Sequence, residues 1–174
     1  MVAVATAIAL FLRAFILAPY YIPSASMEPT LHGCPRCDND HVLVFKAEYD
    51  LHPVRRDDIV VFNRPETWQA IPEKTLIKRV IGVGGDRLRI AGGQVFVNGQ
   101  HLDESFVNNK CVGGTLPERG STASYGPIRK GYVFVMGDNR CNSDDSRHYG
   151  PVPEKDIVGK AVLIIWPFGR IGTL

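Results

Sequence analysis

Glycine and proline interrupt this chain so often that it favours many short strands over long helices. The 174 residues include 17 Gly and 12 Pro, and both residue types punctuate secondary structure. The runs between them are rich in β-branched and aromatic residues, which is typical of strands. We therefore predict strands over residues 41–49, 57–63, 75–83, 87–90, 94–102, 132–136 and 156–166.

Three details of the pattern predict local geometry. Asn98-Gly99 is favoured at a type I′ turn, so the 94–102 run is predicted to be a hairpin. Gly159 interrupts the last run, as at a bend or bulge. Residues 66–74 include Trp68 but show no clear periodicity, and we expect a surface loop there that touches lipid.

Together these runs predict an all-β fold. A chain of 174 residues that is 45% hydrophobic can form one core and a small subdomain. We expect an antiparallel sheet core formed by residues 23–90 and 131–174, with a small β subdomain inserted at 91–130.

The N-terminal residues 1–22 are apolar except for Thr6 and Arg13. About 20 apolar residues span a bilayer, so this segment is long enough to cross one. A cleavable signal peptide is the alternative, but the small-residue cleavage pattern that should follow the apolar region is not clear. We predict a single N-terminal transmembrane helix as a membrane anchor.

The net charge of +2 and the absence of a Lys/Arg block in the sequence give no indication of a nucleic-acid partner. Four cysteines are present, the close pair Cys34 and Cys37 and the single residues Cys111 and Cys141. A Cys-x-x-Cys pair can be half of a zinc site, but a second such pair is missing. An even count on the outer side of a membrane favours disulfides. We predict the disulfides Cys34–Cys37 and Cys111–Cys141 and no metal or cofactor; a zinc or thiol–redox module is the alternative.

Three motifs follow the apolar segment in order. They are SASMEPTL at 24–31, TLIKRVIGVGGD at 75–86 and GDNRCNSDDSR at 137–147, the last followed by Gly150 and Val152-Pro153. They resemble the serine box, the lysine box and the third box of type I signal peptidases, the membrane-bound Ser–Lys proteases that remove signal peptides. With the apolar segment, the resemblance covers residues from about 10 to about 167, and three boxes in one order make it highly specific.

The resemblance implies that Ser26 is the nucleophile and Lys78 the general base. Lysine has an ordinary pKa near 10.4 and is normally charged, but burial beside apolar groups lowers this pKa. On a strand, Lys78 shares one face with Leu76 and Val80, while Arg79 lies on the other face. The sequence therefore allows Lys78 to be buried while Arg79 finds a carboxylate.

The other implied roles surround this pair. The family's oxyanion hole uses the nucleophile's N–H and the hydroxyl two residues earlier, which correspond to Ser26 and Ser24. Ser143 corresponds to the serine that hydrogen-bonds the lysine. Asp145 and Arg147 correspond to a charged pair that braces the site. The apolar residues near the serine that we expect to line a substrate pocket are Ile22, Met27 and Val80.

The resemblance implies a serine endopeptidase on the extracytoplasmic side of the cell membrane, with one membrane pass. Its partners would be the signal peptides of precursor proteins and membrane lipid. Two alternatives share some of these features: a Ser–Lys maturation peptidase of conjugation or organelle inner membranes, and a non-catalytic anchored β-domain. A self-cleaving repressor-type protease is disfavoured because no helix-turn-helix pattern precedes the serine. None of the five histidines lies in a recognisable Ser-His-Asp motif.

Overall fold

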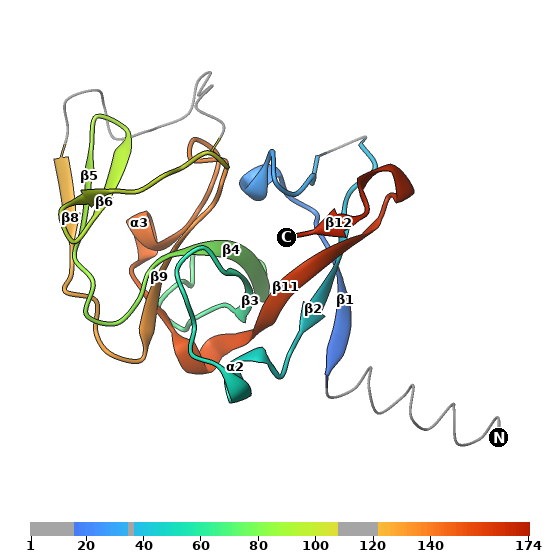
Figure 1. Ribbon diagram of the computed structural model, residues 1–174, viewed down its shortest axis with the longest axis horizontal. Coiled ribbons are helices and arrows are strands. Elements are labelled where there is room, and N and C mark those ends of the chain that lie inside the picture. The colour runs from blue at the N-terminus through green and yellow to red at the C-terminus, as the bar shows by residue number, and fades with distance from the viewer. Residues whose placement is uncertain (1–15, 35–36, 108–121) are drawn as a thin grey trace.

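The computed structural model describes residues 16–34, 37–107 and 122–174, which form two antiparallel β sheets (Figure 1). The larger sheet has the strand order β1-β2-β11-β3-β4-β9-β10, and β12 pairs with β11. Its strands are β1 (Leu17–Tyr21), β2 (His41–Phe45), β3 (Ile59–Asn63), β4 (Thr75–Gly82), β9 (Tyr132–Met136), β10 (Val152–Pro153), β11 (Ile157–Trp166) and β12 (Gly172–Thr173). The predicted all-β class is confirmed by these pairings.

A second sheet, with the order β7-β6-β5-β8, is built from the middle of the chain. Its strands are β5 (Leu88–Ala91), β6 (Gln94–Val97), β7 (Gln100–His101) and β8 (Thr122–Tyr125). This small sheet occupies one end of the molecule, beyond β9 (Figure 1). It already includes β5, which pairs with both β6 and β8, so it begins earlier in the chain than the predicted boundary at residue 91.

The predicted hairpin turn and the predicted bulge are both present in these strands. Asn98 and Gly99 both have positive φ, at 53° and 84°, as the type I′ hairpin requires. The register between β11 and β3 shifts between Ile157 and Gly159, so the predicted bulge is present. A Cβ on Gly159 would lie 2.5 Å from the carbonyl oxygen of Phe45, so the close approach of β2 requires glycine here.

Helical elements are short throughout the described part of the chain. They are α2 (Glu48–Leu51), α3 (Ser146–Tyr149) and the 3₁₀ turns η1 (Ala25–Met27), η2 (Glu154–Asp156) and η3 (Phe168–Arg170). Among the residues that the structure describes, none of the helices has the length and apolar character needed to cross a membrane.

The end of the predicted membrane anchor is a strand and not a helix. All five residues of β1 pair with β2, from Leu17 opposite Phe45 to Tyr21 opposite His41. Pro19 lacks an N–H, which an edge strand such as β1 tolerates. A short apolar run does not by itself distinguish a strand from a helix, and here the pairing with β2 decides. The rest of the predicted anchor, residues 1–15, lies outside the described residues.

Three clusters of buried side chains form the core. One packs Ile22, Met27 and Leu31 beneath the first motif, and a second includes Trp68 and Ile71; the third joins the small sheet to β4 and β9. The predicted lipid-facing loop at 66–74 is therefore wrong at its apolar positions. Trp68 is fully buried, with its ring edge-on to Phe62, because the loop folds back over the sheet.

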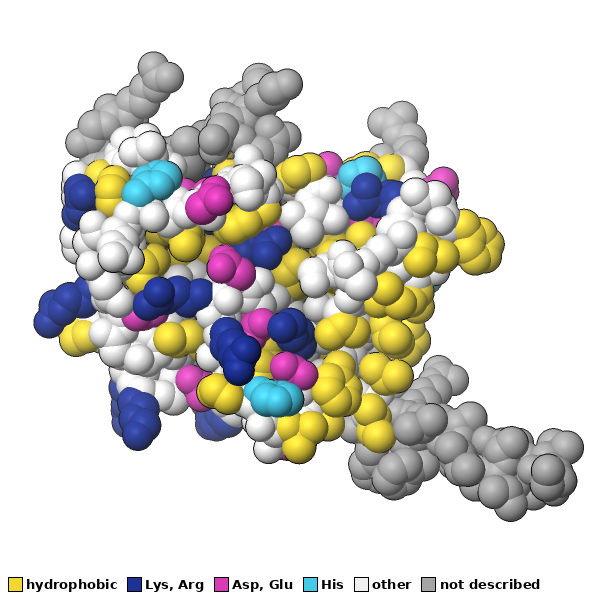
Figure 2. Space-filling view, viewed as in Figure 1, with side chains coloured by type: hydrophobic (Ala, Val, Ile, Leu, Met, Phe, Trp, Pro, Cys, Tyr) yellow, Lys and Arg dark blue, Asp and Glu magenta, His cyan; other side chains and the backbone are white. Residues whose placement is uncertain are grey.

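Few large apolar side chains stay exposed among the residues that the structure describes. Among the most exposed are Trp166, Phe168 and Ile171 at the end of β11 and just beyond it. Figure 2 shows apolar side chains gathered on the side of the molecule where β11 and β12 lie.

Candidate active site

Ser26 and Lys78, 52 residues apart in sequence, meet in a buried hydrogen bond. Nζ of Lys78 lies 2.7 Å from Oγ of Ser26. Lys78 is 3% exposed and Ser26 is 8% exposed. Ser26 lies in the tight turn η1, and Lys78 lies on β4 between β3 and β9. Lys78 and Arg79 point to opposite faces of β4, and both are buried, so side chains cover this part of the strand on both faces.

Burial is the main influence on the Lys78 amine. It lowers the pKa of Lys78 from its ordinary value of 10.5 to about 8, although the carboxylates of Asp145, Asp144 and Glu73 oppose the shift. A neutral amine can accept the Ser26 proton across the same 2.7 Å contact. The pair can therefore supply a nucleophile and a base near neutral pH.

Ser24 lies beside this pair. Its Oγ is 3.2 Å from Oγ of Ser26, so both hydroxyls face the same small space. The turn that holds them needs glycine on two neighbouring segments. A Cβ on Gly33 would lie 2.2 Å from the Ser24 carbonyl oxygen, and one on Gly137 would lie 2.3 Å from that of Ser26. No side chain fits at either position, so these two glycines allow the backbone to close around the turn.

The third motif forms hydrogen bonds to the turn η1, which carries Ser26. Asn139 donates its backbone N–H to the Ser26 carbonyl at 3.1 Å, and its side-chain amide donates to the Ala25 carbonyl at 3.0 Å. Asp138 accepts from the Thr30 hydroxyl at 2.6 Å. Asn139 and Asp138 lie in the third motif and Thr30 in the first, but none of the three has a role that the motifs predict.

Arg79 forms an ion pair with Asp138. Its guanidinium donates to both carboxylate oxygens, at 2.9 and 2.7 Å, and the Asp138 side chain is fully buried. Arg79 is the neighbour of Lys78 on β4, and Asp138 is the neighbour of Asn139. The ion pair therefore joins the strand that carries the amine to the loop that holds the serine turn.

Asp145 and Arg147 are also paired, with two contacts of 2.8 Å. Asp145 caps α3 and accepts the Gly137 N–H at 3.0 Å. Burial opposes ionisation of Asp145, but Arg147 and the Gly137 N–H outweigh burial and hold the pKa of the carboxyl below its ordinary value. A charged pair thus fixes the end of the third motif.

The contact expected between Ser143 and Lys78 is not formed. The Ser143 hydroxyl is buried and lies close to the Asp145 carboxylate, whose pKa it helps to lower, and no hydrogen bond joins it to Lys78. It also lies against Gly137, where a Cβ would meet Oγ at 2.3 Å. In this arrangement the hydrogen bond of the Lys78 amine goes to Ser26.

A cleft of about 370 Å³ runs past Ser24, Ser26 and Lys78. Its apolar wall is made by Ile22, Ala25, Val61, Ala70, Ile71, Pro72, Leu76 and Ile77. Of the predicted pocket residues, Ile22 is in this wall, but Met27 and Val80 are not. Both are fully buried, Met27 in the core beneath the serine turn and Val80 in the cluster around Trp68. On β4, Leu76 and Ile77 line the cleft instead.

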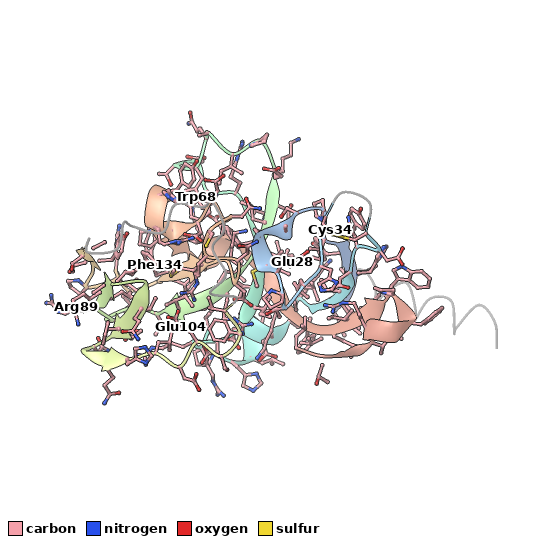
Figure 3. All side chains as sticks on the ribbon, turned by 90° about the horizontal axis from the view of Figure 1, so that it is seen from above. Glu28, Cys34, Trp68, Arg89, Glu104 and Phe134 are labelled. Atoms are coloured by element: carbon pink, nitrogen blue, oxygen red, sulfur yellow. A yellow bond between two sulfur atoms is a disulfide. The ribbon has the colours of Figure 1, made fainter. Side chains whose placement is uncertain are left out.

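The first cysteine pair forms a disulfide. Cys34 and Cys37 are joined just after the serine motif, and Figure 3 labels Cys34 of this pair and Glu28 of that motif. Zinc binds cysteine as a thiolate, and sulfur atoms joined in a disulfide are not thiolates. The alternative hypothesis of a zinc site at Cys34 and Cys37 therefore has no support in this structure. Cys141 is also disulfide-bonded, and its predicted partner, Cys111, lies outside the described residues.

A serine hydroxyl that is hydrogen-bonded to a buried lysine beside a cleft is an arrangement that suits nucleophilic catalysis by a serine hydrolase. Comparison with protein families is more specific. Residues 1–166 match the family described as "Signal peptidase, peptidase S26". The chain belongs to this family, whose members are serine endopeptidases that process signal peptides.

Individual relatives agree with this assignment. The chain is 39% identical to signal peptidase I of Leptolyngbya laminosa, over 96% of this chain and 77% of the relative. It is 37% identical to signal peptidase I of Bacillus caldolyticus, over 95% of this chain and 88% of the relative. A crystal structure of a signal peptidase I from Enterococcus faecalis V583 superposes with a TM-score of 0.51 and 25% identity. That match covers 63% of this chain and 97% of the other.

Proposed function

We propose that this chain cleaves signal peptides from precursor proteins with Ser26 as nucleophile and Lys78 as general base. The observation that carries the proposal is the buried 2.7 Å contact between the two side chains, both of which line the cleft. In the first step, neutral Lys78 takes the Ser26 proton while Oγ attacks the scissile carbonyl carbon.

The negative charge that forms on the carbonyl oxygen needs donors. The Ser26 N–H and the Ser24 hydroxyl are the proposed oxyanion hole, supported by the 3.2 Å separation of the two hydroxyls. When the tetrahedral intermediate collapses, the Lys78 ammonium gives its proton to the leaving amine. Water then hydrolyses the acyl-enzyme ester, with Lys78 again as base.

Substrate selection follows from the wall of the cleft. The family resemblance implies small residues one and three positions before the cut. In this structure Ile22, Leu76 and Ile77 are close to the dyad and leave an apolar surface against which a small side chain fits. A precursor with Ala directly before the cut is expected to be processed, and one with Phe there is expected to resist cleavage.

We also propose that the apolar N-terminal segment ahead of β1 anchors the chain in the cell membrane, with the catalytic domain on the extracytoplasmic side. Apart from Thr6 and Arg13 this segment is apolar, which supports the anchor. The disulfide Cys34–Cys37 supports an oxidising compartment. The exposed Trp166 and Phe168, whose rings lie 4.8 Å apart, are suited to contact lipid.

The test is cleavage of a precursor carrying a signal peptide by purified wild type and Ser26→Ala in detergent, followed by N-terminal sequencing of the product. Wild type should give a single new N-terminus after a small residue, and Ser26→Ala should give none. Cleavage by Ser26→Ala at the wild-type rate would exclude Ser26 as the nucleophile.

A further inference from the structure

A short segment of the small sheet reaches the catalytic core. We call residues 102–107, which follow β7, the return strap. At its start, Leu102 donates its N–H to the Val95 carbonyl at 2.9 Å, which keeps the strap attached to β6. Further on, the Val107 N–H bonds the Glu104 carbonyl at 2.9 Å and closes a turn. In the view of Figure 3, Glu104 lies between Arg89 of the small sheet and Glu28 of the serine motif.

Phe106 of the return strap covers the Arg79–Asp138 ion pair. The guanidinium carbon of Arg79 lies 4.0 Å from the centre of the Phe106 ring. The Arg79 side chain is 10% exposed, and that of Asp138 is fully buried. A ring at this distance attracts the cation through its π face and keeps water away from the pair. Phe106 is thus part of what gives this ion pair its low-dielectric surroundings.

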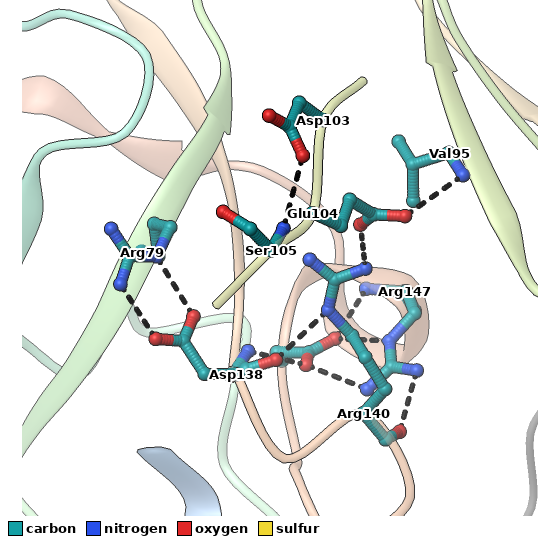
Figure 4. Close-up of polar contacts among 10 residues, drawn as sticks. Arg79, Val95, Asp103, Glu104, Ser105, Asp138, Arg140 and Arg147 are labelled. Atoms are coloured by element: carbon teal, nitrogen blue, oxygen red, sulfur yellow. Dashed lines mark hydrogen bonds and ion pairs between the residues drawn. The ribbon is translucent and has the colours of Figure 1, made fainter. Parts of the chain in front are cut away.

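Glu104 contacts the second arginine of the site. It forms an ion pair with Arg140 and accepts the Val95 N–H at 3.2 Å (Figure 4). Arg140 is 4% exposed and donates Nε–H to the Gly137 carbonyl at 3.0 Å. Glu104 therefore links a strand of the small sheet, through one buried cation, to the backbone of the third motif.

Both arginines act on groups that set the geometry of the dyad. Arg79 follows Lys78 on β4, and its partner Asp138 lies between Gly137 and Asn139 in the chain. Asn139 holds the Ser26 carbonyl at 3.1 Å. A shift of the third motif relative to β4 would therefore change the Ser26–Lys78 contact directly.

We propose that Phe106 and Glu104 are positioning residues for the dyad, so that the small sheet helps to set the rate of signal peptide cleavage. This inference rests on the proposed function of Ser26 and Lys78. Neither residue is among those that line the cleft, so each acts through an arginine and not through the substrate. The effect should fall on kcat, with KM nearly unchanged, because a misplaced dyad slows the chemical step more than binding.

Loss of the ring should also make the rate sensitive to salt. An ion pair in low dielectric is screened little, whereas a hydrated one is weakened as ionic strength rises. Phe106→Leu keeps an apolar side chain but removes the π face and part of the cover. Phe106→Tyr keeps the ring. The two variants therefore separate the stacked ring from simple bulk.

The small sheet offers a matched control. Phe96 on β6 stacks under Arg89 at 4.3 Å in the same sheet, and no contact links that pair to either serine in the structure as described. The experiment measures kcat and KM for a precursor in detergent, at about 50 mM and about 500 mM NaCl, in wild type, Phe106→Leu, Phe106→Tyr and Phe96→Leu. These two salt levels place the screening length on either side of about 10 Å. Thermal unfolding of each variant shows that it is folded at the assay temperature.

We expect Phe106→Leu to lose about tenfold in kcat at low salt and more at high salt, while Phe106→Tyr and Phe96→Leu stay within about twofold of wild type. A Phe106→Leu kcat within twofold of Phe96→Leu at both salt levels would overturn the inference. If Phe106→Leu is unfolded at the assay temperature, Glu104→Gln takes its place, with the same expected loss and the same refuting result. An inactive wild type would contradict the proposed function. An active wild type whose Phe106 and Glu104 variants cleave as fast as it does would instead contradict only the positioning role of these two residues.

Discussion

The dependence of cleavage on pH is the prediction that the structure makes most quantitatively. Burial lowers the pKa of Lys78 to about 8. With that value, about a tenth of the folded enzyme carries a neutral amine at pH 7, about half at pH 8 and about nine-tenths at pH 9. The value of kcat/KM should therefore rise about tenfold from pH 7 to pH 9 and then level off. An amine with the ordinary pKa of 10.5 would instead give a rise of about a hundredfold over the same range, with no plateau by pH 9.

The assay is initial-rate cleavage of a precursor, at substrate concentrations well below KM, in overlapping buffers of constant ionic strength. His32→Asn is the control, since His32 is the histidine closest in sequence to Ser26 and should leave the ascending limb in place. An ascending limb near pH 6.5 that disappears in a histidine variant would refute the reasoning. A rise that continues at tenfold per pH unit through pH 10 would refute the burial of the amine.

Three further predictions follow from the charges around the site. Lys78→Met should be inactive yet more stable than wild type by up to about 3 kcal/mol at pH 7, because it removes a buried ammonium. In urea unfolding this advantage should shrink as pH rises from about 8 to about 10.5, where the unfolded wild type binds more protons than the folded one; an advantage independent of pH would contradict the cause. Glu73→Gln should move the ascending limb to lower pH, since Glu73 raises the pKa of Lys78, whereas Glu66→Gln should not. Arg170→Ala should cost about 3 kcal/mol of unfolding free energy because it leaves the fully buried Asp40 carboxylate without its cation; a loss below about 0.5 kcal/mol would show that the pair is unimportant.

The strands were predictable because their signals are local. Turn residues such as Asn98-Gly99 and the bulge at Gly159 act through backbone geometry that the residue type itself dictates. Ser26 and Lys78 were found through their motifs, and the apolar neighbours of Lys78 on β4 predicted its burial. These inferences needed no knowledge of distant contacts.

Other features depend on contacts between distant segments. Leu17–Tyr21 is apolar enough for a membrane helix, and its pairing with β2 is what makes it a strand. Trp68 lies in a segment without periodicity, and its burial follows from the way this loop folds back over the sheet. Glu104 and Phe106 carry no motif, so only the structure shows that they contact the two arginines of the site. Ser143 lies in an irregular loop, where spacing does not encode side-chain direction, and its hydroxyl does not form the expected hydrogen bond to Lys78 in this structure.

The most direct test of the central claim compares Ser26→Ala, Lys78→Met and the double variant with wild type in precursor cleavage. If the two residues act as one unit, each single variant should lose nearly all of kcat/KM, and the double variant should be no worse than either. All three proteins should keep a cooperative unfolding transition, which shows that the fold is intact. A folded Lys78→Met that cleaves the precursor at a rate near that of wild type would contradict the Ser–Lys mechanism.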